Sequence, residues 1–490
     1  MDLMIRIDRS DRLPLVEQVY WGIRAAIADA TLGPGVRLPS TRELARQLGV
    51  TRFTVDDAYS RLTSEGYLEA RHGSGTYVAA RVRLPPVETA RPAGTPPARR
   101  LSAWAARLPP EPLTAAPQEP VAFNFSGGTP AFDRLPLATW RRLIVREVRD
   151  ATDDAFTYGH TGGLAALREA IAAYVGRSRG VTCDPEQVIV TSGTQQSIDL
   201  VMRMVLEPGA TVIVEEPCYR SVRNIATLSG ATVRPVPVDT GGLMVDRLPP
   251  PSGDVRLVCI TPSHQYPTGA IMPLARRLAL LEWAQAAGAL VMEDDYDGEL
   301  RYDSRPLPAL AALATSGGNV IYSGSFSKVL FPSIRLGYLI VPPDLVTPFL
   351  RAKAIVERHA PTLSQAAVAA FIAEGHFERH LAKMRRLYAG RHDALIAAMD
   401  AHLAGIATRN RAMRSAGLHV LARFELDLTE AEIVARAWTA AIAIDPAGSC
   451  FAAPPDRPHL FLGYTAMPEE RIHAGIARLA GVLRDAPRLP

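Results

Sequence analysis

A lysine is the first residue of this chain whose type and position point to chemistry. The 490 residues include only three lysines, Lys328, Lys353 and Lys383, so all but three of the 54 basic residues are arginine. An arginine keeps its proton, whereas the primary amine of a lysine can lose one and attack a carbonyl carbon to form a Schiff base. Lys353 and Lys383 stand in helical, arginine-rich surroundings and are interpreted as solvated. Lys328, in the stretch SGSFSK, is therefore the candidate for carbonyl chemistry.

Four segments carry polar groups that suit one cofactor. VTSGTQQSIDLV places Gly193, Thr194 and Gln195 at the start of a helix, where backbone N–H groups and the helix dipole bind a phosphate. An aromatic ring, a carboxylate with a phenol, and two serines with an arginine follow along the chain: Tyr219, Asp294, Tyr296, Ser325, Ser327 and Arg335. Pyridoxal 5′-phosphate needs such partners, because its aldehyde takes a lysine and its pyridine nitrogen takes a carboxylate that keeps it protonated. These residues predict pyridoxal 5′-phosphate as the cofactor.

Each of these segments taken alone has another interpretation. The Ser-Gly-Thr start of the helix could be an ordinary cap, and the Glu-Asp-Asp run before Tyr296 could bind magnesium. Tyr219 could be a core aromatic residue. The order and spacing of all the segments together favour the cofactor over these alternatives, and no metal site is predicted.

The elements that must position these residues alternate between strands and helices. Apolar runs such as QVIVTSG, TVIVEEP, VRLVCITPS, ALVMEDDYD and NVIYSGSFSK are separated by helical segments such as GLAALREAIAAYV. This alternation predicts an α/β fold with a mostly parallel sheet covered on both faces. Ligands of such folds bind at the carboxyl ends of the strands, and each of these runs ends in polar residues.

The N-terminal region has a different pattern. LVEQVYWGIRAAIADATLG predicts an amphipathic helix that stops at a glycine, and PSTRELARQLGVTRFTVDDAYSRLTSEGYL predicts two helices joined by a tight turn. Ser40 with Glu43 fits a capping box for the first of these two helices, Gly49 ends it, and Thr51 caps the second. The second helix buries a stripe formed by Val55, Tyr59 and Leu62, and it leaves Arg52 and Asp56 outside. YLEARHGSGTYV predicts two short strands with a glycine-rich tip.

These elements predict a winged helix-turn-helix, in which the start of the second helix enters the major groove of DNA. A small helical dimerisation module is the alternative. Charge does not separate the two, because residues 1–80 contain ten arginines and ten acidic residues.

Composition divides the chain into domains and bounds its location. Residues 81–120 contain ten prolines, which predicts a partly extended linker between a domain of residues 1–80 and one of residues 121–490. The net charge of +4 confines any nucleic-acid site to a local surface. Four widely spaced cysteines favour a reducing compartment, and the chain lacks a signal-peptide core or an apolar run able to span a bilayer. We therefore expect a cytoplasmic protein without membrane contact.

The N-terminal pattern resembles the winged-helix domain of GntR-type bacterial repressors, from LPSTREL to HGSGTYV. The resemblance implies binding to double-stranded operator DNA. It implies operator contacts from Arg42, Arg52 and Thr54, and a wing tip at the minor groove formed by His72 and Gly73. Asp56 stands where some members have a DNA-contacting arginine, which leaves the operator sequence open.

Residues from about 121 onward resemble a fold-type I aminotransferase, through the DDY segment and the SGSFSK block with Arg335. The resemblance implies that Lys328 binds the cofactor covalently, that Asp294 pairs with the pyridine nitrogen and Tyr296 with the ring hydroxyl, and that Tyr219 stacks on the ring. It implies phosphate contacts from Thr194, Gln195, Ser325 and Arg335, with Ser327 and His264 also counted in the site. Tyr158 would reach the phosphate of a partner subunit, which implies a homodimer.

The two domains in this order resemble the MocR-type subfamily of GntR regulators, with two departures from the aminotransferase pattern. In TPSHQYPTG, Tyr266 replaces the usual asparagine, although this form is common in the regulators. In HLFLGYT, Phe461 replaces the arginine that clamps a substrate carboxylate. We therefore expect at most weak transamination.

The function expected from the sequence is a transcription regulator that senses a small-molecule effector, either pyridoxal phosphate or an amine or amino acid. The missing clamp favours pyridoxal phosphate itself as the signal, with control of vitamin B6 synthesis as one setting. The alternatives are a working aminotransferase tethered to DNA and a cofactor-bearing structural dimer that gives no response.

Overall fold

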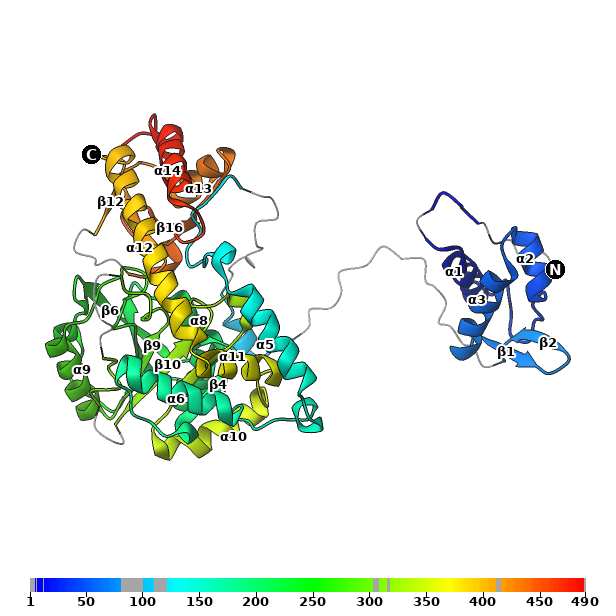
Figure 1. Ribbon diagram of the computed structural model, residues 1–490, viewed down its shortest axis with the longest axis horizontal. Helices are drawn as coiled ribbons and strands as arrows, with labels where there is room; N and C mark the ends of the chain where they lie inside the picture. The colour runs from blue at the N-terminus through cyan, green and yellow to red at the C-terminus, as the bar shows by residue number, and fades with distance from the viewer. Residues whose placement is uncertain are drawn as a thin grey trace. The chain divides into compact units, whose positions relative to one another are not determined.

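The computed structural model describes residues 5, 7–11, 13–80, 100–109, 121–302, 308–314, 318–410 and 416–488 (Figure 1). The chain forms two compact units, Met1–Arg100 and Leu101–Pro490. Most of the predicted linker, residues 81–99 and 110–120, lies outside the described residues. Within it, Ala103–Ala106 form helix α4, and Arg107 Nη2 donates to the carbonyl oxygen of Leu228 at 2.9 Å, so this part of the predicted linker contacts the large unit. The domain boundaries stay a prediction.

The small unit contains three helices followed by a two-stranded hairpin. Its elements are α1 (Leu15–Ala28), α2 (Thr41–Leu48), α3 (Arg52–Ser64), β1 (Leu68–Arg71) and β2 (Gly75–Val78). As predicted, Thr51 Oγ1 accepts the Thr54 N–H at 3.2 Å, and Gly49 ends α2 in the left-handed conformation. The predicted stripe of Val55, Tyr59 and Leu62 is buried in the core of this unit.

Helix α1 ends earlier than the glycine that was predicted to stop it. The last helical residue is Ala28, and Asp29 Oδ1 accepts the backbone N–H of Thr31 at 2.9 Å. Ala30 adopts a positive φ of 64°, which turns the chain out of the helix. A side-chain turn at Asp29 therefore ends α1, because it offers the backbone an alternative to helical hydrogen bonds.

The large unit is built on an eight-stranded sheet of order β4-β11-β10-β9-β8-β5-β6-β7. The strands are β4 (Val188–Thr191), β5 (Thr211–Glu216), β6 (Thr232–Asp239), β7 (Gly242–Leu243), β8 (Val255–Ile260), β9 (Leu290–Asp295), β10 (Val320–Ser325) and β11 (Gly337–Ile340). β10, β9, β8, β5 and β6 pair in parallel, whereas β11 and β7 are antiparallel to their neighbours. The predicted α/β fold with a mostly parallel sheet is confirmed.

Helices cover both faces of this sheet because its central strands are apolar on both sides. In β8, Leu257 and Cys259 pack in the core under α7, α8 and α10, whereas Val258 and Ile260 pack in the core under α9. The helices of these layers are α5 (Leu137–Arg149), α6 (Ala165–Arg179), α7 (Thr194–Val205), α8 (Arg220–Leu228), α9 (Leu274–Ala287), α10 (Val346–Val356) and α11 (Thr362–Ala373).

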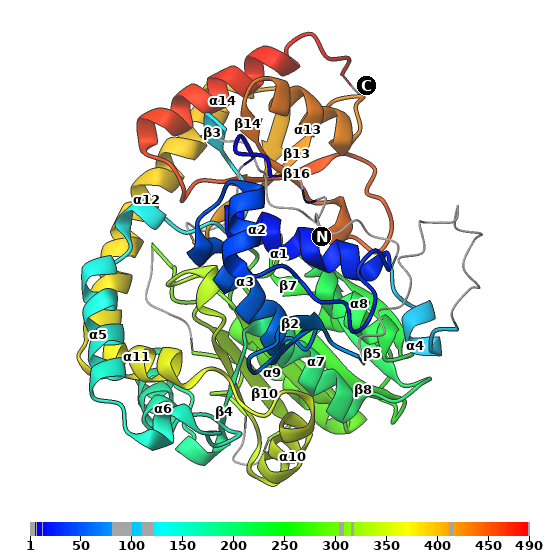
Figure 2. The same cartoon turned by 90° about the vertical axis from the view of Figure 1, so that its right-hand side faces the viewer.

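A second, antiparallel layer completes the large unit. Its four-stranded sheet has the order β12-β13-β16-β15. The elements are β12 (Ala407–Arg409), β13 (His419–Phe424), β15 (Asp445–Pro446), β16 (His459–Gly463), α13 (Glu430–Thr439) and α14 (Glu469–Leu483). β3 (Phe123–Asn124) joins this region by pairing in parallel with β14 (Ile442–Ala443). Helix α12 (His376–His402) runs from the level of α11 to this layer, where it lies beside α14 (Figure 2).

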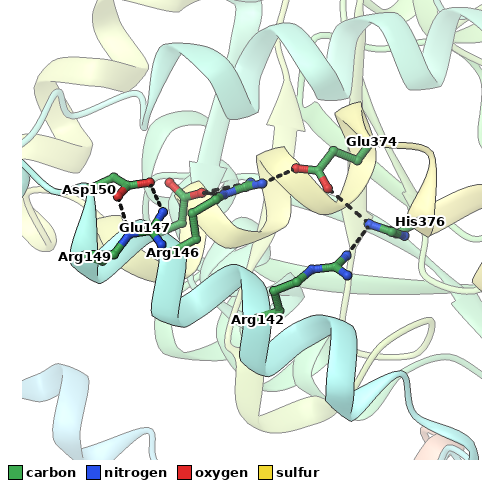
Figure 3. Close-up of polar contacts among 7 residues, drawn as sticks. All are labelled: Arg142, Arg146, Glu147, Arg149, Asp150, Glu374 and His376. Carbon is green, nitrogen blue, oxygen red and sulfur yellow. Dashed lines mark hydrogen bonds and ion pairs between the residues drawn. The ribbon is translucent and has the colours of Figure 1, made fainter.

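Charged side chains tie α5 to the turn between α11 and α12 (Figure 3). Arg146 contacts Glu147 and also Glu374, the latter at 2.6 Å. Glu374 contacts His376 at 3.2 Å, and Arg142 Nη2 lies 3.2 Å from the same imidazole. Such solvent-accessible pairs each contribute about 0–1 kcal/mol, so they orient the helices while the apolar core supplies most of the stability.

In the described part of the chain, no helix is both long enough and apolar enough to cross a membrane.

Candidate cofactor site and DNA-binding surface

A cavity of about 230 Å³ lies at the carboxyl ends of the parallel strands. It opens beside the ends of β9 and β10 and the first turn of α7. Its walls are formed by Thr194, Gln195, Tyr219, Tyr266, Asp294, Tyr296, Ser325, Ser327, Lys328, Pro332 and Arg335. Apart from Tyr158, His264 and Gly193, every residue predicted for the cofactor site lines this cavity.

Lys328 extends into the cavity from the turn after β10. Its Nζ donates to the carbonyl oxygen of Gly128 at 3.4 Å. Gly128 has a φ of +74°, and a Cβ there would lie 2.5 Å from this Nζ, so a larger residue would displace the amine. Burial lowers the pKa of Lys328, an effect that nearby Asp297 and Asp294 oppose. The lowered pKa favours the neutral amine, which is the form that attacks a carbonyl carbon.

Asp294 lies at the end of β9, and one of its carboxylate oxygens accepts no hydrogen bond from the part of the chain that the structure describes. Oδ1 is buried and has no hydrogen-bond partner among the described residues. Burial, followed by the charge of Asp295, raises the pKa of Asp294 to about 7. A buried carboxylate without a partner is unfavourable, and the protonated nitrogen of a pyridine ring would supply both the missing donor and the opposite charge. The residues therefore fit pyridoxal phosphate at this end of the cavity.

Replacing Asp294 with asparagine tests this burial through the pH dependence of folding. The pKa of about 7 in the folded protein exceeds the ordinary value of 3.8, so the folded state keeps a proton that the unfolded state releases. The stability from this group is complete below about pH 4 and is lost as the pH rises towards 7. We expect the unfolding free energy of cofactor-free wild type, relative to Asp294→Asn, to fall by about 1 kcal/mol per pH unit between about pH 5 and 7. Urea unfolding measures this difference, and a pH-independent difference would contradict the expectation.

The opposite end of the cavity suits a phosphate. Gly193, with a φ of +103°, is the N-cap of α7 and leaves the first backbone N–H groups of that helix available. The guanidinium of Arg335 lies 3.7 Å from where a Cβ of Gly193 would be. Ser325 Oγ accepts the Ser327 N–H at 3.2 Å, which shapes the turn beside Arg335. The helix start and the arginine together favour an anion.

A buried lysine lies beneath this phosphate end. Lys353 is 1% exposed, and its Nζ contacts Glu357 Oε2 at 2.8 Å. Ser192, which precedes Gly193, donates its hydroxyl to the same carboxylate. The interpretation of Lys353 as solvated was wrong, because its place on α10 puts it on the buried side with Phe349. Lys353 does not line the cavity, and Lys383 is exposed as expected.

His264 lies behind Tyr296 instead of lining the cavity. Its Nδ1 is 3.1 Å from the hydroxyl oxygen of Tyr296 and 2.9 Å from Asp297 Oδ2. The imidazole is buried, and a Cβ on Gly417 would lie 2.3 Å from it, so the backbone of Gly417 packs closely against the ring. His264 and Asp297 therefore act through Tyr296. Sequence reasoning missed Asp297, although its position next to Tyr296 at the end of β9 was a usable signal.

An aromatic cluster surrounds Phe461, the residue at which the resemblance implies that the carboxylate clamp is missing. Phe461 lies 4.8 Å from the ring of His419 and 5.7 Å from that of Tyr266, which also contacts Tyr219 and Tyr296. Burial lowers the pKa of His419 to about 3, so this imidazole is neutral at neutral pH. The cluster provides apolar surface and no positive charge.

The arginines that could replace the clamp are engaged elsewhere. Arg223 donates to the carbonyl oxygens of residues 449–451, and Arg457 contacts Glu425 Oε2 at 3.6 Å. Neither these two nor Arg220 lines the cavity. The arginine that does line it, Arg335, lies at the phosphate end.

A larger, open depression of about 680 Å³ lies in the antiparallel layer, between residues 426–432 and 448–458. None of the predicted site residues lines it. Its Glu430 carboxylate accepts the backbone N–H groups of Gly448 and His459, which makes that residue part of the framework. The smaller cavity at the strand ends is therefore the candidate site.

Tyr158 is on the outside of the large unit. Its side chain is 79% exposed, and the Arg358 guanidinium lies 4.5 Å from the centre of its ring. Phe156, two residues before Tyr158, and Ile355 and Val356, shortly before Arg358 in the chain, also expose their side chains. This patch leaves Tyr158 available to another molecule.

In the small unit, most of the predicted DNA-contact residues are exposed. Arg42 is on α2, and His72 and Gly73 form the hairpin tip, where Gly73 has a φ of +72°. Arg52 Nε contacts Asp56 Oδ2 at 3.3 Å on the outer face of α3.

The structure does not bring Thr54 to that face. Thr54 is buried, and its hydroxyl oxygen lies 2.8 Å from that of the helix-capping Thr51. Phe53, which sequence reasoning did not select, is 78% exposed instead.

Comparisons with known protein families match both units. Residues 15–78 match the gntR family of bacterial regulatory proteins, and residues 121–447 match the class I and II aminotransferases. The chain is 38% identical to a probable rhizopine catabolism regulatory protein, MocR, of Rhizobium meliloti, over 97% of this chain and 95% of that protein. It is 36% identical to the pyridoxine biosynthesis regulator PdxR of Corynebacterium glutamicum, over 79% of each chain.

A solved structure also resembles the large unit. LysN, an α-aminoadipate aminotransferase of Thermus thermophilus complexed with N-(5′-phosphopyridoxyl)-L-leucine, matches with a TM-score of 0.71 and 30% sequence identity. The match covers 78% of this chain and 97% of LysN.

Proposed function

Because the chain belongs to the MocR-type subfamily of GntR transcription regulators, we propose that occupancy of its aminotransferase-like unit controls the affinity of its winged helix for operator DNA. The predicted regulator class and the predicted cofactor, pyridoxal 5′-phosphate, are both confirmed. Binding to operator DNA follows from the gntR unit.

The cavity residues divide the binding of the cofactor among them. Lys328 would hold it covalently, Asp294 would pair with its ring nitrogen, and Tyr296 with its ring hydroxyl. Tyr219 would stack on the ring, and the phosphate would be bound by Thr194, Gln195, Ser325, Ser327 and Arg335. When bound, the cofactor supplies an electron sink at its protonated ring. The ring of Tyr266, which lines the cavity and packs against Phe461, excludes water from that wall. His264 with Asp297 fixes the hydroxyl of Tyr296.

One observation supports pyridoxal phosphate itself as the signal. The groups that bind the cofactor are all present, whereas the position of the amino-acid clamp is occupied by Phe461 in an aromatic cluster with a neutral His419. An amino-acid effector would leave its carboxylate there without a charged partner, which is costly in a buried site. The site therefore favours the cofactor over an additional amino-acid ligand, whose carboxylate would lie near Phe461. By analogy with PdxR, control of pyridoxine synthesis is the setting that we propose.

A second candidate effector is an amine without a carboxylate. The name of the MocR relative refers to the catabolism of rhizopine and not to the synthesis of pyridoxine. The setting that this chain controls could therefore differ from that of PdxR. The fold of the large unit also leaves a tethered aminotransferase as an alternative function. Multiple turnover with amino acids and a keto acid would support that alternative over the regulator.

The exposed patch around Tyr158 supports a homodimer. Tyr158 is 79% exposed, and Phe156, Ile355 and Val356 in the segments around Tyr158 and its partner Arg358 are exposed too. Exposed apolar side chains of this kind are what a second copy would cover. We propose that Tyr158 contacts the phosphate site of the partner subunit. Light scattering of the wild type should give the mass of a dimer, and Ile355→Asp should shift it towards the monomer. A monomeric wild type would contradict the proposal. Since operator DNA lies in the cytoplasm of a bacterial cell, we propose that the protein is located there.

Operator affinity with and without the cofactor tests the proposed function. A duplex selected from a random library by the full-length chain serves as the operator. We expect an affinity change of about fivefold or more between the cofactor-free and the loaded protein. After loading with pyridoxal phosphate and dialysis, Lys328→Ala should behave as the cofactor-free wild type, because it has no lysine there to hold the cofactor covalently. Equal affinities, combined with a shift caused by one amine after loading, would instead identify that amine as the effector.

A further inference from the structure

Helix α3 presents an aromatic ring to solvent on its first turn. The side chain of Phe53 is 78% exposed, while the next two residues, Thr54 and Val55, are buried. In the described residues of the small unit, the ring has no aromatic or cationic partner, unlike Trp21, which contacts Tyr20 and Arg24. Phe53 therefore contributes little to the core of the unit.

Both arginines of α3 are paired with carboxylates. Arg52 contacts Asp56 at 3.3 Å, and Arg61 pairs with Glu17 of α1. Asp57, which lies one turn after Phe53, is exposed and acidic. Acidic groups on this face repel the DNA backbone, so α3 gains less affinity from phosphate contacts than two unpaired arginines would supply. Beside Arg52, the first turn of α3 offers the phenyl ring of Phe53 to a base edge.

The chemistry of the major groove restricts what a phenyl ring can recognise. The N-terminal residues of a recognition helix face the base edges there. The edges of guanine, cytosine and adenine present hydrogen-bond donors and acceptors, whereas thymine also presents an apolar 5-methyl group. A phenyl ring cannot form the hydrogen bonds, but it can cover the methyl group and remove both from water.

We propose that Phe53 contacts the 5-methyl group of a thymine in the operator and so selects an A·T pair at one position of each site bound by α3. The inference rests on the proposed DNA contact of α3 and adds the base that it distinguishes. Alternatively, the exposed ring could pack against the small unit of a second copy of this chain. The experiment below distinguishes a contact with thymine from a contact between subunits.

Replacing thymine with deoxyuridine removes the methyl group and nothing else. The full-length chain is first used to select duplexes from a random library, and each thymine of the selected duplex is then replaced in turn. We expect wild type to lose about three- to tenfold in affinity at one thymine position of each site bound by α3, which matches the burial of one methyl group and its contacts. Phe53→Ala should bind the thymine and deoxyuridine duplexes equally. Phe53→Leu should keep part of the discrimination.

Two further variants distinguish recognition of the thymine methyl group from the loss of any exposed ring and from a general loss of DNA affinity. Trp21→Ala removes another exposed aromatic ring from the same unit and should leave the discrimination between thymine and deoxyuridine unchanged. Arg52→Ala should weaken binding to both duplexes by the same factor. Light scattering of Phe53→Ala should give the same mass as wild type.

The inference is overturned if wild type tolerates deoxyuridine at every position or if Phe53→Ala keeps the full discrimination. A changed mass for Phe53→Ala with unchanged discrimination would assign the ring to a contact between subunits. If the full-length chain selects no sequence at all, the DNA contact of α3 fails, and the role of Phe53 fails with it.

Discussion

Lys328→Ala is expected to abolish the visible absorbance that a lysine-bound pyridoxal phosphate gives to the protein. Lys328 is the lysine that lines the cavity. Lys353 is held by Glu357 under the phosphate end, and Lys383 is exposed on α12, so neither can take its place. Without the amine, the cofactor is retained only by its phosphate and ring contacts. Absorbance after dialysis, and borohydride treatment followed by mass spectrometry, measure the loss.

Lys383→Ala is the matched control, because it removes an exposed lysine from the same unit. It should keep the spectrum and the borohydride adduct of wild type. A stoichiometric borohydride adduct in Lys328→Ala would show that another amine binds the cofactor and would refute the assignment.

Arg179→Met is expected to destabilise the large unit by about 3–5 kcal/mol. Arg179 Nη2 contacts Asp295 Oδ2 at 2.6 Å, with both side chains 1% exposed, and it also donates to Ser263 at 2.8 Å. Removing the guanidinium leaves the Asp295 carboxylate buried without its opposite charge, next to Asp294. Methionine fills most of the volume, so the loss comes mainly from the unpaired charge. Urea unfolding of the large unit measures the effect.

The double variant Arg179→Met/Asp295→Asn separates charge from packing. It removes both charges, and Tyr322, which donates to Asp295 Oδ2 at 2.6 Å, can still donate to the asparagine oxygen. We expect the double variant to recover more than half of the lost stability. A single variant that costs less than about 1 kcal/mol would show that the pair contributes little net stability.

The cavity could be predicted from the sequence because parallel strands place their carboxyl ends at one edge. Asp294, Ser325 and Lys328 follow apolar strand runs, and the sheet order makes β9 and β10 neighbours. The start of α7 follows β4, which pairs with β11 beside β10. Local patterns thus identified residues that the topology brings together.

Strand patterns could not predict whether a side chain lines the cavity or lies behind a residue that does. His264 follows the end of β8 and was counted with the cavity, but its loop turns the imidazole towards Asp297 behind Tyr296. The strand pattern carries no information about the path of that loop. The burial of Thr54 reflects its hydroxyl contact with Thr51, an interaction that competes with exposure on the helix surface.

The misjudged Lys353 had a signal in the sequence. Phe349, Lys353 and Glu357 are spaced by four residues, which places them on one side of a helix. A phenylalanine on that side indicates burial, and a carboxylate four residues after the lysine supplies the partner that burial requires. The many arginines nearby do not show whether this side of the helix is exposed, because they describe the composition of the segment and not the position of each residue on its faces.

Reciprocity between cofactor and operator tests the central claim most directly, because coupled binding sites must change each other's affinity by the same factor. The measurement is the affinity of the cofactor-free, full-length protein for pyridoxal phosphate, with and without saturating operator duplex. We predict that operator DNA changes the cofactor affinity by the same factor, about fivefold or more, by which the cofactor changes the operator affinity. A cofactor affinity that is identical with operator, with a duplex of unrelated sequence and without DNA would contradict the coupling.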